Sequence, residues 1–273
     1  MTKLPYQRII SYGCSLTAGS ELSDHQFLGM TENELYDYVK NNNIRGTHDL
    51  FVKLKVTHNE YQAIIASNAA RSWPNYIVKH FGVDFSNRAR PGTSLSNATY
   101  HILKDLDESR INDDDLILVG ITSPTRWFQF TETGENTGGV FGYMPDGEYF
   151  KQLELEWGNA YNVMYCHYKE IAFLSDLSDR LNGQIKLCYA FGSPEYIKHA
   201  YAEELTNPEF SDFFRFCVSL APLHNFIDHE NSISEIASYL DRTRHHVFGH
   251  PRVQFHERFA NILIEKMEKM YND

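Results

Sequence analysis

The sequence predicts an α/β fold built on a parallel sheet. Apolar, strand-like stretches at residues 7–12, 83–87, 116–119 and 185–191 alternate with segments that carry apolar residues at helical spacing, such as 159–181. Residues 116–119 (LILV) are continuously apolar, which is typical of a strand buried on both faces of a parallel sheet. Strands that alternate with helices in this way indicate βαβ units, and therefore a parallel sheet.

Length, charge and cysteine usage limit the class of protein. A chain of 273 residues with a net charge of -11 argues against a nucleic-acid partner held by phosphate contacts. No stretch approaches the ~18 apolar residues of a membrane span, and the start has no apolar signal-peptide core. The 4 cysteines form no C-x-x-C pattern, which favours a reduced compartment. We expect a soluble, cytoplasmic protein whose single domain covers 1–273.

Three segments depart from the regular alternation. Residues 21–60 are polar and irregular, and we interpret them as an inserted loop with a short helix near 32–40. This insertion forms either a lid or wall beside the first strand end, or a solvated excursion. Residues 129–150 are rich in glycine and predict a second long loop. Residues 193–240 have a helical, aromatic pattern and are expected to cover one side of a site.

The first strand ends in a turn rich in Gly, Ser and Thr, GCSLTAG at residues 13–19. Ligands of open α/β sheets bind at the carboxyl ends of the strands, so Ser15 is a candidate nucleophile. The alternative is that Ser15 and Thr17 only cap the following segment. The spacing excludes a phosphate-binding P-loop, a G-x-G-x-x-G fingerprint and the G-x-S-x-G nucleophile elbow.

Two further strand ends carry candidate site residues. The second strand runs into NRARPGTS at 87–94, where a glycine turn precedes a helix. Backbone N–H groups at such a turn favour negative charge, so Gly92 is a candidate oxyanion donor, or the segment is an ordinary turn and N-cap. The third strand ends at GITSPTRW, 120–127. Arg126 there either binds a substrate carboxylate or pairs with an acid structurally.

A histidine-rich stretch, RHHVFGHP at 244–251, precedes the last helix. Pro251 suits the first helical position, which places His250 at the cap, where it can reach a partner. The crowding of His245, His246, His250 and His256 raises the question of a metal. Because H-E-x-x-H is absent and no ligand spacing is evident, we expect neither a metal nor a cofactor.

In chain order these motifs resemble the blocks of the SGNH/GDSL hydrolases. GCSLTAG is similar to block one, G-D-S-x-T-x-G, with Cys14 in place of Asp, and residues 87–94 resemble block two in its N-x-A-x-P-G-x-S form. Block three, G-x-N-D, is matched at Gly120 but has Thr122 where Asn is expected. The final block, with a His, a Pro and a second His six residues on, resembles His250, Pro251 and His256.

The resemblance implies a flavodoxin-like, three-layer α/β/α sandwich with a mostly parallel sheet. It also implies hydrolysis of an ester, such as acetyl groups on carbohydrates or lipids, or a thioester. Ser15 would be the nucleophile and His250 the base, and the N–H groups of Ser15 and Gly92, with Thr122 as a weaker third donor, would form the oxyanion hole. If so, Ser15 and His250 lie within hydrogen-bond reach or slightly beyond it.

The acid that should orient His250 is missing from its usual place, where Val247 and Phe248 stand. Another carboxylate could supply it, with Asp228, Glu230 and Asp241 nearest in sequence. A backbone carbonyl could accept from the imidazole instead, or the site is inactive. The departures from the pattern leave open a catalytically impaired binding or structural protein. The G-C-S and S-P-T-R forms also resemble uncharacterised phage-associated members, so a virion-associated location stays open.

Overall fold

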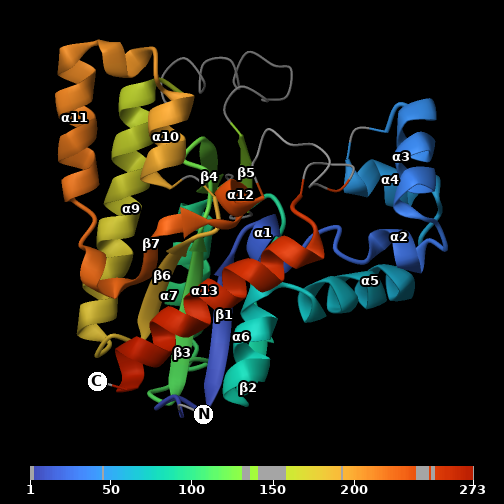
Figure 1. Ribbon diagram of the computed structural model, residues 1–273, viewed down its shortest axis with the longest axis horizontal. Helices are drawn as coiled ribbons and strands as arrows, with labels where there is room; N and C mark the ends of the chain where they lie inside the picture. The colour runs from blue at the N-terminus through green and yellow to red at the C-terminus, as the bar shows by residue number, and fades with distance from the viewer. Residues whose placement is uncertain are drawn as a thin grey trace.

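A five-stranded parallel sheet forms the centre of the protein, and Figure 1 shows it in a computed structural model. The structure describes residues 3–44, 46–130, 136–140, 158–191, 193–237, 246 and 250–272. The strand order is β2-β1-β3-β6-β7. All neighbouring pairs are parallel, as predicted, and the strands are β1 (Arg8–Gly13), β2 (Asp84–Asn87), β3 (Asp115–Ile121), β6 (Ile185–Tyr189) and β7 (Phe226–Ser232).

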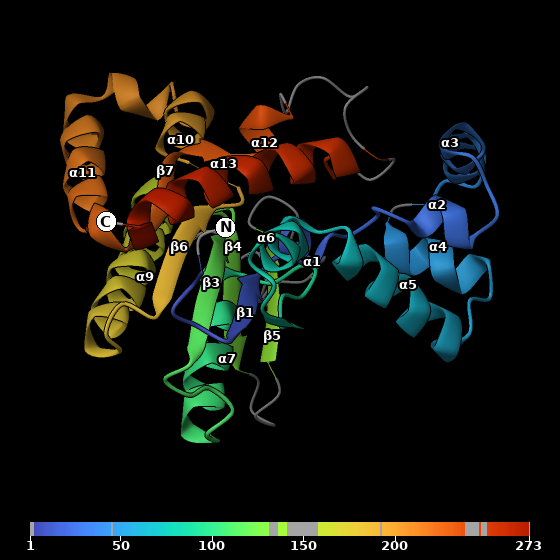
Figure 2. The same cartoon turned by 60° about the horizontal axis from the view of Figure 1, so that its bottom comes forward.

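Helices cover both faces of this sheet, which gives the three layers of an α/β/α sandwich (Figures 1 and 2). Alternate residues of β1 point to opposite faces. Ile10 and Tyr12 pack with one set of helices, and Ile9 packs with the other. The first set is α7 (Leu95–Asp107), α9 (Ala160–Arg180), α10 (Pro194–Ala200) and α11 (Pro208–Ser219). The second set is α1 (Ser15–Ala18), α6 (Trp73–Phe81), α12 (Ile233–Ile236) and α13 (Val253–Asn272).

The segment after α1 is more regular than the sequence predicted. The helix expected near 32–40 is present as α3 (Glu32–Asn41), but α2 (Asp24–Phe27) and α4 (Thr47–Lys53) were missed, and α5 (His58–Ala70) follows them. Capping boxes start α3 and α5, because Thr31 and Thr57 each bond the backbone and side chain of a Glu three residues on. These helices, which lie to the right in Figure 1, bury a small apolar cluster of their own.

Other expectations also need correction. The region 193–240, predicted to be helical, holds the edge strand β7, besides α10, α11 and the short 3-10 helices η1 (Glu204–Thr206) and η2 (Leu223–Asn225). Only the start of β7, Phe226 and Ile227, is apolar, so its sequence lacks a strand-length pattern. Pro251 is not the first residue of the last helix, because α13 starts at Val253.

The second predicted loop, 129–150, is only partly described. It overlaps the antiparallel pair β4 (Arg126–Phe130) and β5 (Asn136–Val140), while 131–135 and 141–150 lie outside the described residues. Where the chain is described, no helix is long and apolar enough to cross a membrane.

Candidate functional site

The carboxyl ends of β1 and β3 meet at one edge of the sheet. Gly13 of β1 is in register with Gly120 of β3. Ser15 starts α1 two residues after Gly13, and Thr122 follows the end of β3, so the parallel pairing brings these two predicted residues to the same edge. Both are buried.

The paired glycines let α1 pack directly over the strand ends. A Cβ added at Gly13 would lie 2.5 Å from Oγ1 of Thr17, and one added at Gly120 would lie 2.0 Å from the same atom. Real Cβ atoms do not approach this closely, and Gly13 also has a φ of +144°. Glycine at both positions therefore fixes the place of α1, and with it the place of Ser15.

The turn that carries Gly92 is tied to the end of β1. The Arg90 N–H donates to the Gly13 carbonyl at 3.0 Å, and the Thr93 hydroxyl donates to the same carbonyl at 2.9 Å. Gly92 has a φ of +80°, a left-handed conformation that favours glycine. At the start of this turn the Asn87 side chain accepts from Ser11 Oγ at 2.9 Å. These bonds hold the predicted oxyanion loop beside the strand that leads to Ser15.

Thr122 is 1% exposed, and its hydroxyl has no hydrogen-bond partner within the described ranges. A buried hydroxyl without a partner costs free energy, of order 1–3 kcal/mol. A ligand oxygen that accepted from it would relieve this cost. The expectation that Thr122 can supply a hydrogen bond at this edge is therefore compatible with its surroundings.

His250 is held by a carboxylate that the sequence analysis did not identify. Nδ1 of His250 is hydrogen-bonded to Oε2 of Glu21, and the backbone N–H of His250 donates to the same oxygen at 3.2 Å. Glu21 is only 3% exposed and has a φ of +68°. When Nδ1–H donates to Glu21, Nε2 is the basic nitrogen of the imidazole.

Glu21 belongs to the same turn as the predicted nucleophile. The N–H groups of Gly19 and Ser20 both donate to the Ser15 carbonyl at 2.9 Å, which closes the turn that leads from α1 to Glu21. Glu21 thus links the Ser15 segment to His250. No hydrogen bond joins the Ser15 hydroxyl directly to His250 in the described part of the chain, and their proximity stays a prediction.

A polar cluster supports this turn from α5. Asn68 donates to Asp24 at 2.7 Å and accepts from the backbone N–H of Ser23 at 2.7 Å. Burial raises the pKa of Asp24 to about 6 against the opposing bond from Asn68, and the charge of Glu21 adds to the rise. Asp24 is therefore a neighbour of Glu21 with its own partner, and it does not contact His250 through a hydrogen bond.

The acids proposed from sequence lie elsewhere or outside the described residues. Asp228 bonds Lys266 Nζ at 2.8 Å and Asn231 at 2.9 Å. Glu230 lies 3.6 Å from Lys266 Nζ, and Asp241 lies outside the described ranges. Glu21 was missed because its partner is far away in sequence, and the only local signal was its position two residues after GCSLTAG.

Two other residues singled out in the sequence have different surroundings. His256 is fully buried, its Nδ1 accepts from the Trp73 N–H at 3.3 Å, and burial lowers its pKa to about 3. It therefore joins α13 to α6 as a neutral imidazole. Arg126 opens β4, and its role, either in binding a substrate carboxylate or in a structural ion pair, stays a prediction.

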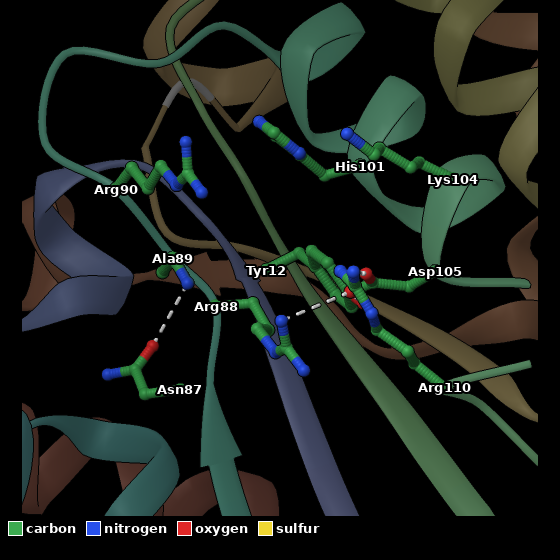
Figure 3. A pocket seen from close by; sticks show the side chains of 9 residues that line it. All are labelled: Tyr12, Asn87, Arg88, Ala89, Arg90, His101, Lys104, Asp105 and Arg110. Carbon is green, nitrogen blue, oxygen red and sulfur yellow. Dashed lines mark hydrogen bonds and ion pairs between the residues drawn. The ribbon is translucent and has the colours of Figure 1, made fainter. Parts of the chain in front are cut away.

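A cationic cavity of about 210 Å³ lies beside the Arg90 turn, between the end of β2 and α7 (Figure 3). At its base Asp105 accepts from the Tyr12 hydroxyl at 2.6 Å and from Arg110 at 3.0 Å. Burial alone would raise the pKa of Asp105, but the Tyr12 bond and the charges of Arg88 and Arg110 outweigh it and lower the pKa.

The upper part of the cavity has no comparable acid. Arg90, His101 and Lys104 lie together there (Figure 3), and Nε2 of His101 is buried without a partner among the described residues. Burial lowers the pKa of His101, and Arg90 and Lys104 lower it further. This lining favours an anionic occupant. Neither Ser15 nor His250 belongs to it, so the cavity is separate from the candidate acyl site.

Comparison with known proteins gives structural neighbours only. No family model matches the sequence, and no curated protein matches it. A carbohydrate esterase structure is 13% identical, with a TM-score of 0.46 over 98% of this chain and 70% of that chain. Esterase EstA from Pseudoalteromonas sp. is 10% identical, with a TM-score of 0.46 over 98% of this chain and 100% of that chain.

A GDSL-like lipase from Parabacteroides merdae is 12% identical, with a TM-score of 0.42 over 97% of each chain. Other neighbours include an SGNH hydrolase from Slackia heliotrinireducens, which is 10% identical with a TM-score of 0.42, over 96% of this chain and 99% of that chain. In its structure the protein is similar to esterases and SGNH/GDSL-type hydrolases, at low sequence identity.

Proposed function

We propose that the protein is a serine ester hydrolase in which Ser15 is the nucleophile, His250 the general base and Glu21 the acid of the triad. The observation that carries the proposal is the bond between Glu21 and Nδ1 of His250. A buried carboxylate at this nitrogen is the partner that a catalytic histidine needs, and the sequence motifs alone did not supply one.

The proposed reaction follows the double-displacement route of serine hydrolases. Ser15 Oγ attacks the acyl carbon while Nε2 of His250 takes the hydroxyl proton. Collapse of the tetrahedral intermediate expels the alcohol, which receives that proton from His250. Water then attacks the acyl-enzyme with His250 again as base, and the proton returns to Ser15 as the acid product leaves.

Glu21 acts on the imidazole rather than on the substrate. It accepts a hydrogen bond from Nδ1–H and so fixes the tautomer in which Nε2 is basic, and its charge stabilises the imidazolium that forms in the transition state. Because Glu21 is 3% exposed, water screens this interaction little. The second bond, from the His250 backbone N–H at 3.2 Å, holds the carboxylate in place.

The proposed oxyanion hole uses groups at the carboxyl edge of the sheet. The N–H groups of Ser15 and Gly92 are its backbone donors, and the Thr122 hydroxyl is the third. Support comes from the bonds that tie the Gly92 turn to Gly13 and from the absence of a partner for the Thr122 hydroxyl in the described part of the chain. The substrate class that we infer is a small acyl ester of a carbohydrate or lipid.

Turnover of a short p-nitrophenyl ester, together with labelling by a fluorophosphonate, tests the proposal. We expect turnover by the wild-type protein and a label that mass spectrometry places on Ser15, and we expect Ser15→Ala to lose both. Neither turnover nor labelling in the folded wild-type protein would overturn the proposal. That result would favour a non-catalytic binding protein on this fold. Cys14 also favours this alternative, because it stands at the position of the Asp in block one of the hydrolases and is buried in an apolar cluster.

A further inference from the structure

The short helices after α1 place two polar side chains opposite a histidine from the C-terminal part of the chain. His25 lies in α2, Glu32 lies in the first turn of α3, and His246 comes from far along the sequence. Each residue offers one ligand atom, and these three atoms all lie within 4.8 Å of one another. Nδ1 of His246 is 3.6 Å from Oε1 of Glu32, and the two imidazole rings stack with centroids 6.2 Å apart.

The imidazoles have hydrogen-bonding capacity that the protein does not use. Nδ1 of His25 and Nε2 of His246 are both buried, and neither has a partner among the residues described. The His246 side chain is 8% exposed, so water does not readily replace the missing bonds. Buried polar atoms without partners are rare, and each needs a physical explanation such as an ion.

Glu32 is already oriented for a ligand. Arg252 donates to its Oε2 at 2.9 Å, which leaves Oε1 as the oxygen that faces His246. A cation that binds the carboxylate from the other side keeps this bond, and such outer partners fix the direction of metal ligands.

We propose that His25, Glu32 and His246 bind a zinc ion, with a water molecule at the fourth position. Two imidazole nitrogens and one carboxylate oxygen form a donor set that suits Zn²⁺ and does not suit Mg²⁺ or Ca²⁺. Ligand atoms around tetrahedral zinc lie about 3.3 Å apart, as bond lengths of ~2.0–2.1 Å require. Zinc binding therefore requires side-chain rotations that bring the ligand atoms from within 4.8 Å of one another to this spacing.

The protonation states agree with this assignment. Burial lowers the pKa of His246 to about 4, although Glu21 and Glu32 oppose the shift. Burial also lowers the pKa of His25, and Arg71 and Arg252 add to the fall while Glu32 opposes it. Both rings are therefore neutral at pH 7, which is the form that coordinates a metal.

The zinc would act beside the proposed catalytic base. The N–H of His246 donates to the carbonyl of His250 at 2.7 Å, so an ion held by His246 steadies the backbone that carries the base. It would also join that backbone to α2 and to α3, whose buried residues Leu35 and Val39 belong to the separate apolar cluster. The sequence analysis expected no metal because it weighed only the histidines near the last helix, and did not consider His25 and Glu32 together with His246.

Zinc binding to the untagged protein tests the proposal without any use of activity. We expect one equivalent of zinc by titration against a chromophoric chelator, a tetrahedral absorption spectrum with Co²⁺, and a higher Tm when zinc is added. His25→Ala and Glu32→Gln should each weaken binding at least tenfold and remove the Tm shift, whereas the exposed His48→Ala should change neither.

Several outcomes would overturn the site. One is that the wild-type protein takes up no stoichiometric zinc. Another is that the His25→Ala and Glu32→Gln variants are folded by circular dichroism and still bind zinc as the wild type does. Equal loss in His48→Ala would show binding by surface histidines only. Because the readout is metal content, the zinc site and the hydrolase proposal can fail separately.

Discussion

Replacement of Glu21 by glutamine removes the charge beside His250 while nearly keeping the side-chain shape. In the structure one oxygen of Glu21 accepts from both Nδ1 and the backbone N–H of His250. A glutamine carries no charge, so the imidazolium is no longer stabilised. Its amide can also turn so that the NH₂ group donates to Nδ1, which favours the tautomer in which Nε2 carries the proton and cannot act as the base. Loss of a triad acid in this way lowers kcat on the order of 10⁴-fold, which corresponds to about 5 kcal/mol of transition-state stabilisation.

The assay for Glu21→Gln is p-nitrophenyl ester turnover beside the rate of fluorophosphonate labelling, and both should fall. The matched control is Glu230→Gln on β7, which should keep wild-type kcat because Glu230 lies near Lys266 and not at His250. Loss of the Glu21 charge should also lower the pKa of Asp24 from about 6, a change that NMR titration can follow. A folded Glu21→Gln protein that keeps more than a tenth of wild-type kcat would refute the assignment.

Three further changes test other parts of the site and fold. Ser15→Ala should abolish turnover and leave Tm nearly unchanged, since a nucleophile acts mainly in the transition state; large destabilisation with unchanged turnover would make Ser15 a structural residue. Thr122→Val should lower kcat by up to roughly 10²–10³-fold if the hydroxyl donates to the oxyanion, and an unchanged kcat would exclude this role. The same change should leave the free energy of unfolding equal or raise it by about 1 kcal/mol, because the lost hydroxyl has no partner in the described part of the chain. Tyr12→Phe should destabilise the fold by about 1.5–3 kcal/mol through the lost bond to ionised Asp105. Because the pKa of Asp105 is lowered in the folded state, the stability that its charge contributes is present above the unfolded pKa of about 3.9 and is lost as pH falls. The difference in the free energy of unfolding between wild type and Tyr12→Phe, measured with denaturant, should therefore become smaller on acidification. A difference that does not depend on pH would contradict this.

Local sequence signals predicted the elements whose pattern is complete within a few residues. The apolar run of β3 is buried at every position, and α9 begins where Asn159 caps it. The sequence predicted a parallel sheet whose strand ends share one edge, and the structure adds that β1 and β3 are neighbours, with Gly13 in register with Gly120. The strand β7 was missed because its apolar part is only two residues long, and its place at the edge of the sheet leaves the rest without a hydrophobic pattern.

The sequence by itself determined the parallel α/β class and the strand ends at which Ser15, Gly92 and Thr122 lie, because glycine turns and buried strands leave local patterns. Only the tertiary structure decided the partner of His250. Glu21 has a left-handed backbone conformation, and its hydrogen bond to His250 depends on the packing of segments far apart in the chain. The proximity of His25 and Glu32 to His246 also depends on the packing of segments far apart in the chain. Contacts between distant segments are set by how whole elements pack, and no short pattern of residues encodes them.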